Sequence, residues 1–166
     1  TDTYNTNLKM NPPLRTAEDA LALQAAVADG TVDCIVTDHA PHAAHEKDCE
    51  WEISYFGCIG LETSLPLMVT NMVRTNKLSY TGLVRAMAVN PRRILRLAPV
   101  KIAAGYKADL TLFDPEKKVQ ITTEYFESKS KNSAFIGAEL YGVATDVFVD
   151  GKRVLADEVV VPGGEK

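Results

Sequence analysis

The sequence lacks the features that mark secreted, membrane-spanning and nucleic-acid-binding proteins. It has only three cysteines, with no CxxC spacing, so it offers no disulfide framework and suits a reducing cytoplasm. No apolar run approaches the length of a membrane span, and no signal peptide is visible. The net charge of −4 and the lack of any basic run argue against a nucleic-acid-binding surface.

Histidine is also scarce, with three in a chain of 166 residues, a length that suits one domain of ordinary size with at most a small appendix. Apolar residues make up 46% of the sequence and charged residues 24%, which is the range of globular proteins. The first residues are polar and include no initiator methionine, so we expect the chain to be a piece of a longer one.

One short stretch combines a strand pattern with groups capable of acid–base chemistry. Val32–Val36 form an apolar-rich run that predicts a buried strand. Directly after it come the carboxylate of Asp38 and the imidazoles of His39 and His42, while Pro41 prevents a strand or helix from continuing. Many α/β enzymes place their chemistry in this way, on a loop at the end of a buried strand.

The residues of this loop allow alternative roles. Asp38 could ligate a metal and exchange protons with bound water, or it could cap a helix or pair with an arginine. His42 could hold an anionic group or a metal, or be a polar surface residue, and His39 is the better candidate for a structural role. A zinc cluster of the three histidines with Cys49 is disfavoured, because a proline interrupts the helix that would align them.

The first part of the chain predicts a strand–loop–helix–strand unit. A short strand at Leu8–Met10 is followed by two prolines and by a helix over Ala17–Asp29. Thr16 is a suitable N-cap for this helix, and Gly30 is placed to end it. The strands before and after the helix should then be parallel neighbours with a right-handed crossover.

Two other loops carry groups that could contact a ligand. Asn11 lies in the loop stiffened by prolines, where the alternative is a plain connector. Arg15 could bind a carboxylate, although a salt bridge with an acidic residue at the start of the helix is favoured. Gly57, after Phe56, and Gly60 permit close backbone approach to a ligand, but a simple turn explains them nearly as well.

The rest of the chain predicts helices followed by strands. Residues 43–60 predict a long loop, which could close over a substrate. Helices are expected at residues 61–75 and 80–89, followed by a short third helix capped by Asn90, with Ile94, Leu95 and Leu97 as its buried side. Strands are expected at residues 109–113, 119–122, 143–149 and 152–156, with a hairpin turn at Asp150–Gly151.

Six short strings occur in an order that resembles a known family. They lie at residues 9–15, 37–42, 56–63, 90–95, 105–110 and 130–137. Together they resemble class I dihydroorotases, a branch of the cyclic amidohydrolase family, across nearly the whole chain. The strings at 11–15 and 38–42 distinguish dihydroorotases from hydantoinases and allantoinases, whereas the string at 107–110 is shared by the wider superfamily.

The resemblance implies an α/β fold, a metal-dependent-hydrolase (β/α)8 barrel with a small β domain built from both chain ends. Residues 1–100 would hold the last barrel strands and helices, and residues 101–166 the C-terminal β segments of the small composite domain. Asp38 would then lie at the end of the final barrel strand, on the catalytic face.

The resemblance also implies reversible cyclisation of N-carbamoyl-L-aspartate to L-dihydroorotate, in de novo pyrimidine synthesis. In the hydrolytic direction a zinc-bound hydroxide would attack the ring amide carbonyl, with Asp38 as zinc ligand and general base. Asn11 and His42 would bind the substrate through its carboxylate. Backbone amides around Phe56 and Gly57 would complete the pocket.

Much of the family's active site is missing from this chain. The paired histidines of the first barrel strand and the mid-barrel ligands are absent, and a complete barrel needs about 250 residues. Most ligands of the one or two Zn²⁺ ions would therefore lie outside the chain. We expect a C-terminal portion that is inactive alone and works with the N-terminal portion of the same enzyme, in a homo-oligomer and with aspartate carbamoyltransferase as a candidate partner.

Two alternatives remain open at this point. One is a non-catalytic dihydroorotase-like partner of aspartate carbamoyltransferase, which a His-x-His string upstream of Thr1 would exclude. The other is an allantoinase or hydantoinase. His42 favours an acidic substrate over these, because a neutral ring offers no carboxylate for a histidine to bind.

Overall fold

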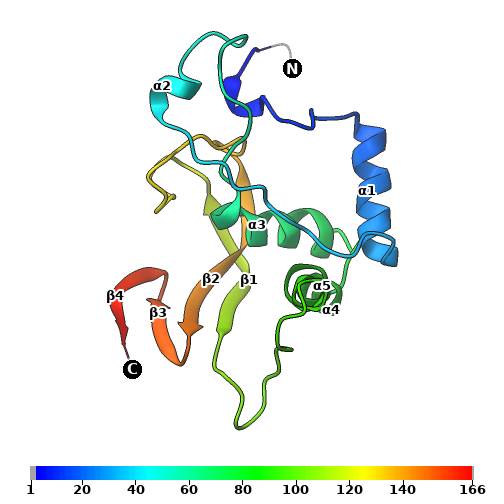
Figure 1. The fold of residues 1–166 in the computed structure, drawn as a ribbon, viewed down its shortest axis with the longest axis vertical. Coiled ribbons are helices and arrows are strands. Elements are labelled where there is room, and N and C mark those ends of the chain that lie inside the picture. The colour runs from blue at the N-terminus through cyan, green and yellow to red at the C-terminus, as the bar shows by residue number, and fades with distance from the viewer. Residues whose placement is uncertain (1–2, 166) are drawn as a thin grey trace. The chain divides into compact units, whose positions relative to one another are not determined.

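The computed structural model describes residues 3–165 as a mixture of helices and one antiparallel sheet (Figure 1). In chain order the elements are the 3₁₀ helix η1 (Thr6–Leu8), α1 (Ala17–Asp29), α2 (Ala44–Lys47), α3 (Leu61–Met68), the π-helical η2 (Val69–Val73), α4 (Tyr80–Val84), the π-helical η3 (Arg85–Val89), α5 (Asn90–Ile94), β1 (Leu110–Gln120), β2 (Glu139–Val149), β3 (Lys152–Ala156) and β4 (Val159–Glu165). The sheet order is β1-β2-β3-β4. None of the described helices has the length and apolar character that crossing a membrane requires.

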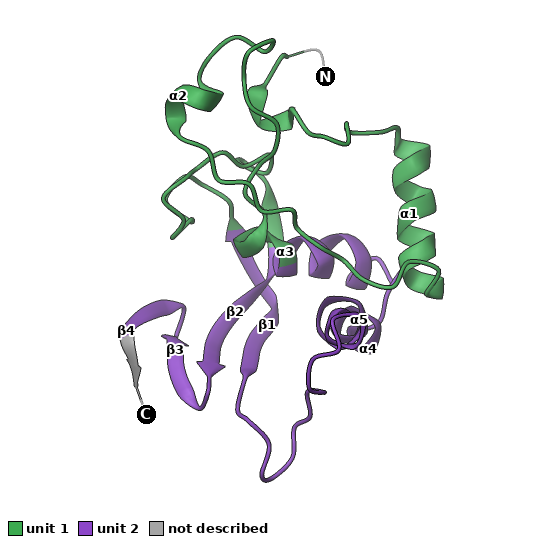
Figure 2. Cartoon of the chain, in the orientation of Figure 1, with its two compact units in different colours: residues 1–64, 120–140 green, residues 65–119, 141–166 purple. Residues whose placement is uncertain are grey.

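The chain divides into two compact units that interleave along the sequence (Figure 2). Unit 1 comprises residues 1–64 and 120–140, and unit 2 comprises residues 65–119 and 141–166. The buried apolar residues of unit 1 include Ile59, Ile121 and Phe126, and those of unit 2 include Val69 and Met72. The division at residue 100 that the resemblance implies concerns a longer protein and stays a prediction.

Helix α1 has the bounds that the sequence predicts. Thr16 accepts a hydrogen bond from the Asp19 backbone, and Asp19 accepts one from the Thr16 backbone, which completes a capping box. Gly30 ends the helix with a φ of 86°, a conformation that glycine adopts without strain. The apolar side chains Leu21 and Leu23 are nevertheless more than half exposed, so the apolar surface of α1 is largely uncovered.

The strands predicted on either side of α1 are not formed. The 3₁₀ helix η1 occupies the chain up to Leu8, and residues 33–43 have no regular secondary structure. A strand needs a neighbour to bond its backbone groups, and Val32–Val36 have no strand partner among the described residues. The βαβ prediction is therefore wrong for this chain, and Val36 is 76% exposed.

The helical region is more continuous than the sequence suggests. Ser79 caps α4, accepting a hydrogen bond from the Gly82 backbone N–H at 3.1 Å. Asn90 does not act as a cap, because it is helical, with φ −65° and ψ −44°, and the chain runs from η3 into α5 without a break. A proline removes one helical hydrogen bond, and the π-helical η3 just before Pro91 re-spaces the bonds so that the helix continues.

The predicted buried side of α5 is exposed. Ile94, Leu95 and Leu97 are each more than half accessible. α5 ends at Ile94, so Leu95 and Leu97 lie beyond the helix, and the expectation that these three side chains are buried is wrong for the described chain.

The sheet differs from the prediction in two places. β1 is one strand that passes through Asp114–Pro115, where two strands were expected, and its position at the sheet edge tolerates a proline. The hairpin turn at Asp150–Gly151 is confirmed, with φ values of 54° and 76°. β4 was not predicted, since the turn before it, Asp157–Glu158, adopts positive φ without the usual glycine.

Thr63, in α3, is fully buried, and its hydroxyl has no hydrogen-bond partner among residues 3–165. An unpaired buried hydroxyl costs free energy, so Thr63→Val should raise the free energy of unfolding by about 1 kcal/mol. Urea denaturation of both proteins measures the difference. A loss of stability in the valine variant would show that the hydroxyl has a partner after all.

Candidate active site

His42 lies in unit 1 and is contacted from three directions. Its Nε2 is 2.9 Å from the Phe56 carbonyl oxygen, which can only accept, so Nε2 is the donor in this bond. Nδ1 is 3.6 Å from a carboxylate oxygen of Glu46, and the ring stacks on Tyr55 with centroids 5.5 Å apart. The fold thus brings together two of the predicted site residues, His42 and Phe56.

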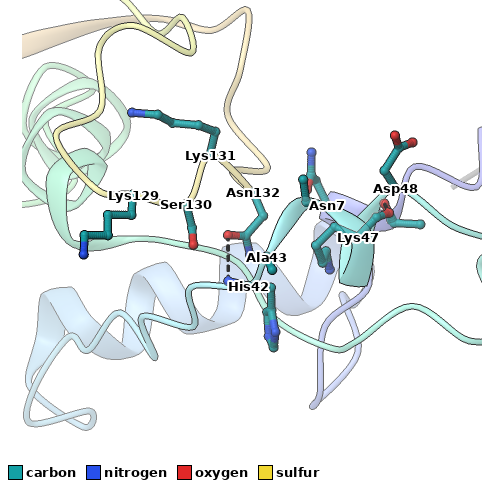
Figure 3. A pocket seen from close by; sticks show the side chains of 11 residues that line it. Asn7, His42, Ala43, Lys47, Asp48, Lys129, Ser130, Lys131 and Asn132 are labelled. Carbon is teal, nitrogen blue, oxygen red and sulfur yellow. Dashed lines mark hydrogen bonds between the residues drawn. The ribbon is translucent and has the colours of Figure 1, made fainter.

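Asn132 joins the loops on both sides of this histidine. Its Oδ1 accepts from the His42 backbone N–H at 3.2 Å, the bond drawn in Figure 3. Its Nδ2 donates to the carbonyl of Ala40 at 2.9 Å and to that of Gly57 at 3.4 Å, and its own carbonyl accepts from Ile59. Asn132 is buried, so it fixes three loop segments by bonds that water does not replace.

Gly57 lies where the Phe56 segment passes closest to the loop at residue 40. Its φ is 106°, and a Cβ atom here would lie 2.7 Å from the Cβ of Ala40. Its N–H donates to the Lys9 carbonyl at 2.8 Å, so this amide is engaged within the chain. Glycine is therefore required both for the backbone conformation and for the close approach.

Gly57→Ala should lower the free energy of unfolding by about 3 kcal/mol, because it combines positive-φ strain with a steric clash. The control is Gly137→Ala, in the same unit, where φ is 91° but no atom lies within 4 Å of the new methyl. That variant should lose only about 1 kcal/mol. Equal losses in the two variants by urea denaturation would contradict a clash at Ala40.

Asp38 and His39, which are adjacent at the end of the predicted strand, have different environments. Asp38 is exposed, with a φ of 44°, and no arginine pairs with its carboxylate within the described residues. Burial raises the pKa of the Cys58 thiol, and the negative charge of Asp38 raises it further. His39 accepts from the backbone N–H groups of Gly60 and Leu61 at 3.2 and 3.3 Å, so its predicted structural role is confirmed.

The residues of the proline loop remain on the surface. Asn11 is exposed, two residues after Lys9, whose carbonyl accepts from Gly57. Arg15 forms the predicted salt bridge, with its Nε 3.3 Å from a carboxylate oxygen of Asp19. The ligand role of Asn11 stays a prediction.

The described residues contain no group of three histidine, cysteine or acidic side chains that could hold a metal ion. The three histidines do not converge: His39 binds the start of α3, His42 binds Phe56, and His45 is exposed on α2. Asp38 by itself is a single carboxylate. A zinc site therefore does not fit these residues alone, and no reaction step is assigned to a metal on their evidence.

A cavity of about 560 Å³ opens beside His42 in unit 1 (Figure 3). It is lined by Thr6, Asn7, His42, Ala43, Ala44, Lys47, Asp48, Lys129, Ser130, Lys131 and Asn132. The lining side chains include amide, hydroxyl, ammonium and carboxylate groups, which suits a polar ligand.

Three residues that organise this region were not identified from the sequence. Lys9 and Lys47 are buried lysines, and Asn132 is a buried amide in the string at residues 130–137. Burial lowers the pKa of Lys47, which the charge of Lys9 lowers further. All three could have been suspected only from their position in or near the family's strings, since composition does not reveal which polar residue is buried.

Comparison with known proteins identifies the family. The model of the amidohydrolase family matches residues 5–154, and the chain belongs to this family. Dihydroorotase from Geotalea daltonii is 48% identical over 151 residues, 91% of this chain and 35% of that protein. Dihydroorotase from Clostridium acetobutylicum is 44% identical over 153 residues, 92% of this chain and 36% of that protein. The resemblance to dihydroorotases is thus confirmed, and the chain spans about a third of the length of these curated relatives.

The fold agrees with that of a solved hydantoinase. L-hydantoinase from Arthrobacter aurescens superimposes with a TM-score of 0.88 at 31% identity, over 95% of this chain and 36% of that one. The helices and the small antiparallel sheet are therefore those of an amidohydrolase segment.

Proposed function

We propose that this chain is the C-terminal portion of a dihydroorotase, which converts N-carbamoyl-L-aspartate to L-dihydroorotate and back in pyrimidine synthesis. The observation that carries the proposal is the 48% identity to a dihydroorotase over 91% of the chain. The amidohydrolase family model matches residues 5–154, a range that contains every site residue named above. Identity to the hydantoinase is lower, at 31%. On this proposal the enzyme works in the cytoplasm, as a homo-oligomer.

The geometry of unit 1 supports particular roles for three residues. Asp38 offers an exposed carboxylate without an ion-pair partner in the described chain, suited to accept a proton as general base. It would supply at most one ligand to a zinc ion whose other ligands lie outside these residues. His42 and Asn11 bind the substrate carboxylate. For this, His42 exchanges the Phe56 carbonyl for a carboxylate, which is the stronger acceptor.

The exposed apolar segments support a larger fold around this chain. The apolar-rich run Val32–Val36 forms no strand within the described residues, and the side chains of Val36, Leu21 and Leu23 are exposed. In a (β/α)8 barrel the strands before and after α1 would pair with neighbours, and α1 would cover them. The missing neighbours belong, on this proposal, to the N-terminal portion of the enzyme, without which the chain turns nothing over.

The substrate assignment is tested on the enzyme reconstituted from both portions. Dihydroorotate, allantoin, dihydrouracil and hydantoin are assayed side by side. Hydrolysis of dihydroorotate at a kcat/KM well above the others supports the proposal. Preference for hydantoin or dihydrouracil would favour the second candidate, a hydantoinase, which the structural match to L-hydantoinase brings into consideration. A folded complex that hydrolyses none of them would contradict the proposal and favour a non-catalytic homologue.

A further inference from the structure

Lys9 is a buried cation whose side chain donates hydrogen bonds to three backbone carbonyls. Its Nζ donates to the carbonyl oxygens of Trp51, Glu52 and Ser54, at 2.6, 3.2 and 2.8 Å. The ammonium also lies 4.7 Å from the centroid of the Phe56 ring. Burying a charge is costly unless it is fully hydrogen-bonded, and here three donors meet three acceptors.

Lys47 repeats this arrangement on the residues that follow. It is also buried, and its Nζ donates to the carbonyls of Tyr55 at 2.8 Å and Gly57 at 3.0 Å. Together the two ammonium groups bind five carbonyl oxygens between residues 51 and 57. The Phe56 carbonyl lies between the two that Lys47 binds, and it points instead to Nε2 of His42 at 2.9 Å.

The main chain of Lys9 also bonds to residues 51–57. Its carbonyl accepts from the N–H of Gly57 at 2.8 Å, so both the backbone and the side chain of Lys9 hold residues 51–57. Lys9 lies two residues before Asn11 in the sequence. Lys9 therefore connects the proline loop to residues 51–57.

We propose that Lys9 and Lys47 are positioning residues: they fix the backbone of residues 51–57 and thereby set the direction of the Phe56 carbonyl and the orientation of the His42 ring. The proposal deepens the proposed function, because it rests on His42 and the Phe56 segment contacting the substrate. An arginine cannot replace Lys9, because a planar guanidinium group cannot donate to three carbonyl oxygens arranged around a single nitrogen atom. A methionine keeps the length of the side chain but donates nothing.

The first readout is the ring of His42 in the whole chain, observed by nitrogen NMR. In the unmodified protein the bond to Phe56 keeps the proton on Nε2. Lys9→Met should lose this signature, giving mixed tautomers, and should speed amide hydrogen exchange at residues 53–57 roughly tenfold or more. The control is Lys152→Met on β3, an exposed lysine, which should leave both readouts unchanged.

The second readout is the kinetics of the reconstituted enzyme. Lys9→Met should raise KM for dihydroorotate roughly tenfold with kcat within about a factor of three, because substrate binding is disturbed and Asp38 is not. If Lys9→Met does not fold, Lys9→Arg is measured instead and should show the same changes. A folded variant with the normal His42 signature and a normal KM would overturn the proposal. If the ring signature changes but the unmodified mixture hydrolyses no dihydroorotate, the positioning role holds and the proposed function fails.

Discussion

Replacing Asp38 with asparagine should lower kcat for dihydroorotate hydrolysis roughly a thousandfold in the reconstituted enzyme. Asparagine has nearly the shape of aspartate but cannot accept a proton under working conditions. It also tolerates positive φ, which Asp38 adopts at 44°, so the backbone should not change. The measurement is kcat together with hydrogen exchange of α1 and α3, which should match those of the unmodified chain.

A matched control for this substitution is available within the chain. Asp157 is also an exposed aspartate with positive φ, at 49°, in the turn between β3 and β4. Asp157→Asn should therefore retain activity within about a factor of two, the range usual for a surface substitution away from the site. If Asp38→Asn retained activity as well, the carboxylate would have no part in the chemistry and the proposed site would be wrong.

Asn132→Ala should lower the free energy of unfolding by about 3 kcal/mol. The alanine removes both side-chain donors and the acceptor of a buried amide, leaving the Ala40 carbonyl and the His42 N–H without their partner. These two partly buried backbone groups, left unpaired, account for most of the loss. Urea denaturation followed by far-UV circular dichroism measures it.

Asn71→Ala is the control for this prediction. Asn71 is exposed, and its side-chain amide donates to the Leu67 carbonyl of the same helical segment at 3.0 Å. Alanine is a better helix former than asparagine, so this variant should stay within about 0.5 kcal/mol of the unmodified chain. A loss for Asn132→Ala as small as this would mean that Asn132 does not hold the three loops together.

Local sequence signals predicted the elements whose stability is local. The bounds of α1 follow from Thr16 and Gly30, and the hairpin follows from Asp150–Gly151, because in each case a few adjacent residues fix the backbone. Strand formation at Val32–Val36 depends instead on a partner strand far away in the sequence. The apolar pattern is there, but no described segment pairs with it.

Some residues of the candidate site could likewise be predicted from the sequence, and others could not. The sequence indicates Asp38, His42, Asn11 and the Phe56–Gly57 segment by residue type and resemblance, and the structure brings His42 to Phe56. It does not indicate Lys9, because nothing in a sequence distinguishes a lysine that binds three carbonyls from one on the surface. Such a role depends on the path of a loop some 40 residues away along the chain.

The central claim is tested most directly by complementation. The 166-residue chain is mixed with the part of the Geotalea daltonii dihydroorotase outside the matched 35%, and dihydroorotate hydrolysis is measured. We expect hydrolysis by the mixture, none by either portion alone, and loss of hydrolysis when the chain carries Asp38→Asn. Hydrolysis by the chain alone, or by a mixture containing that variant, would contradict it.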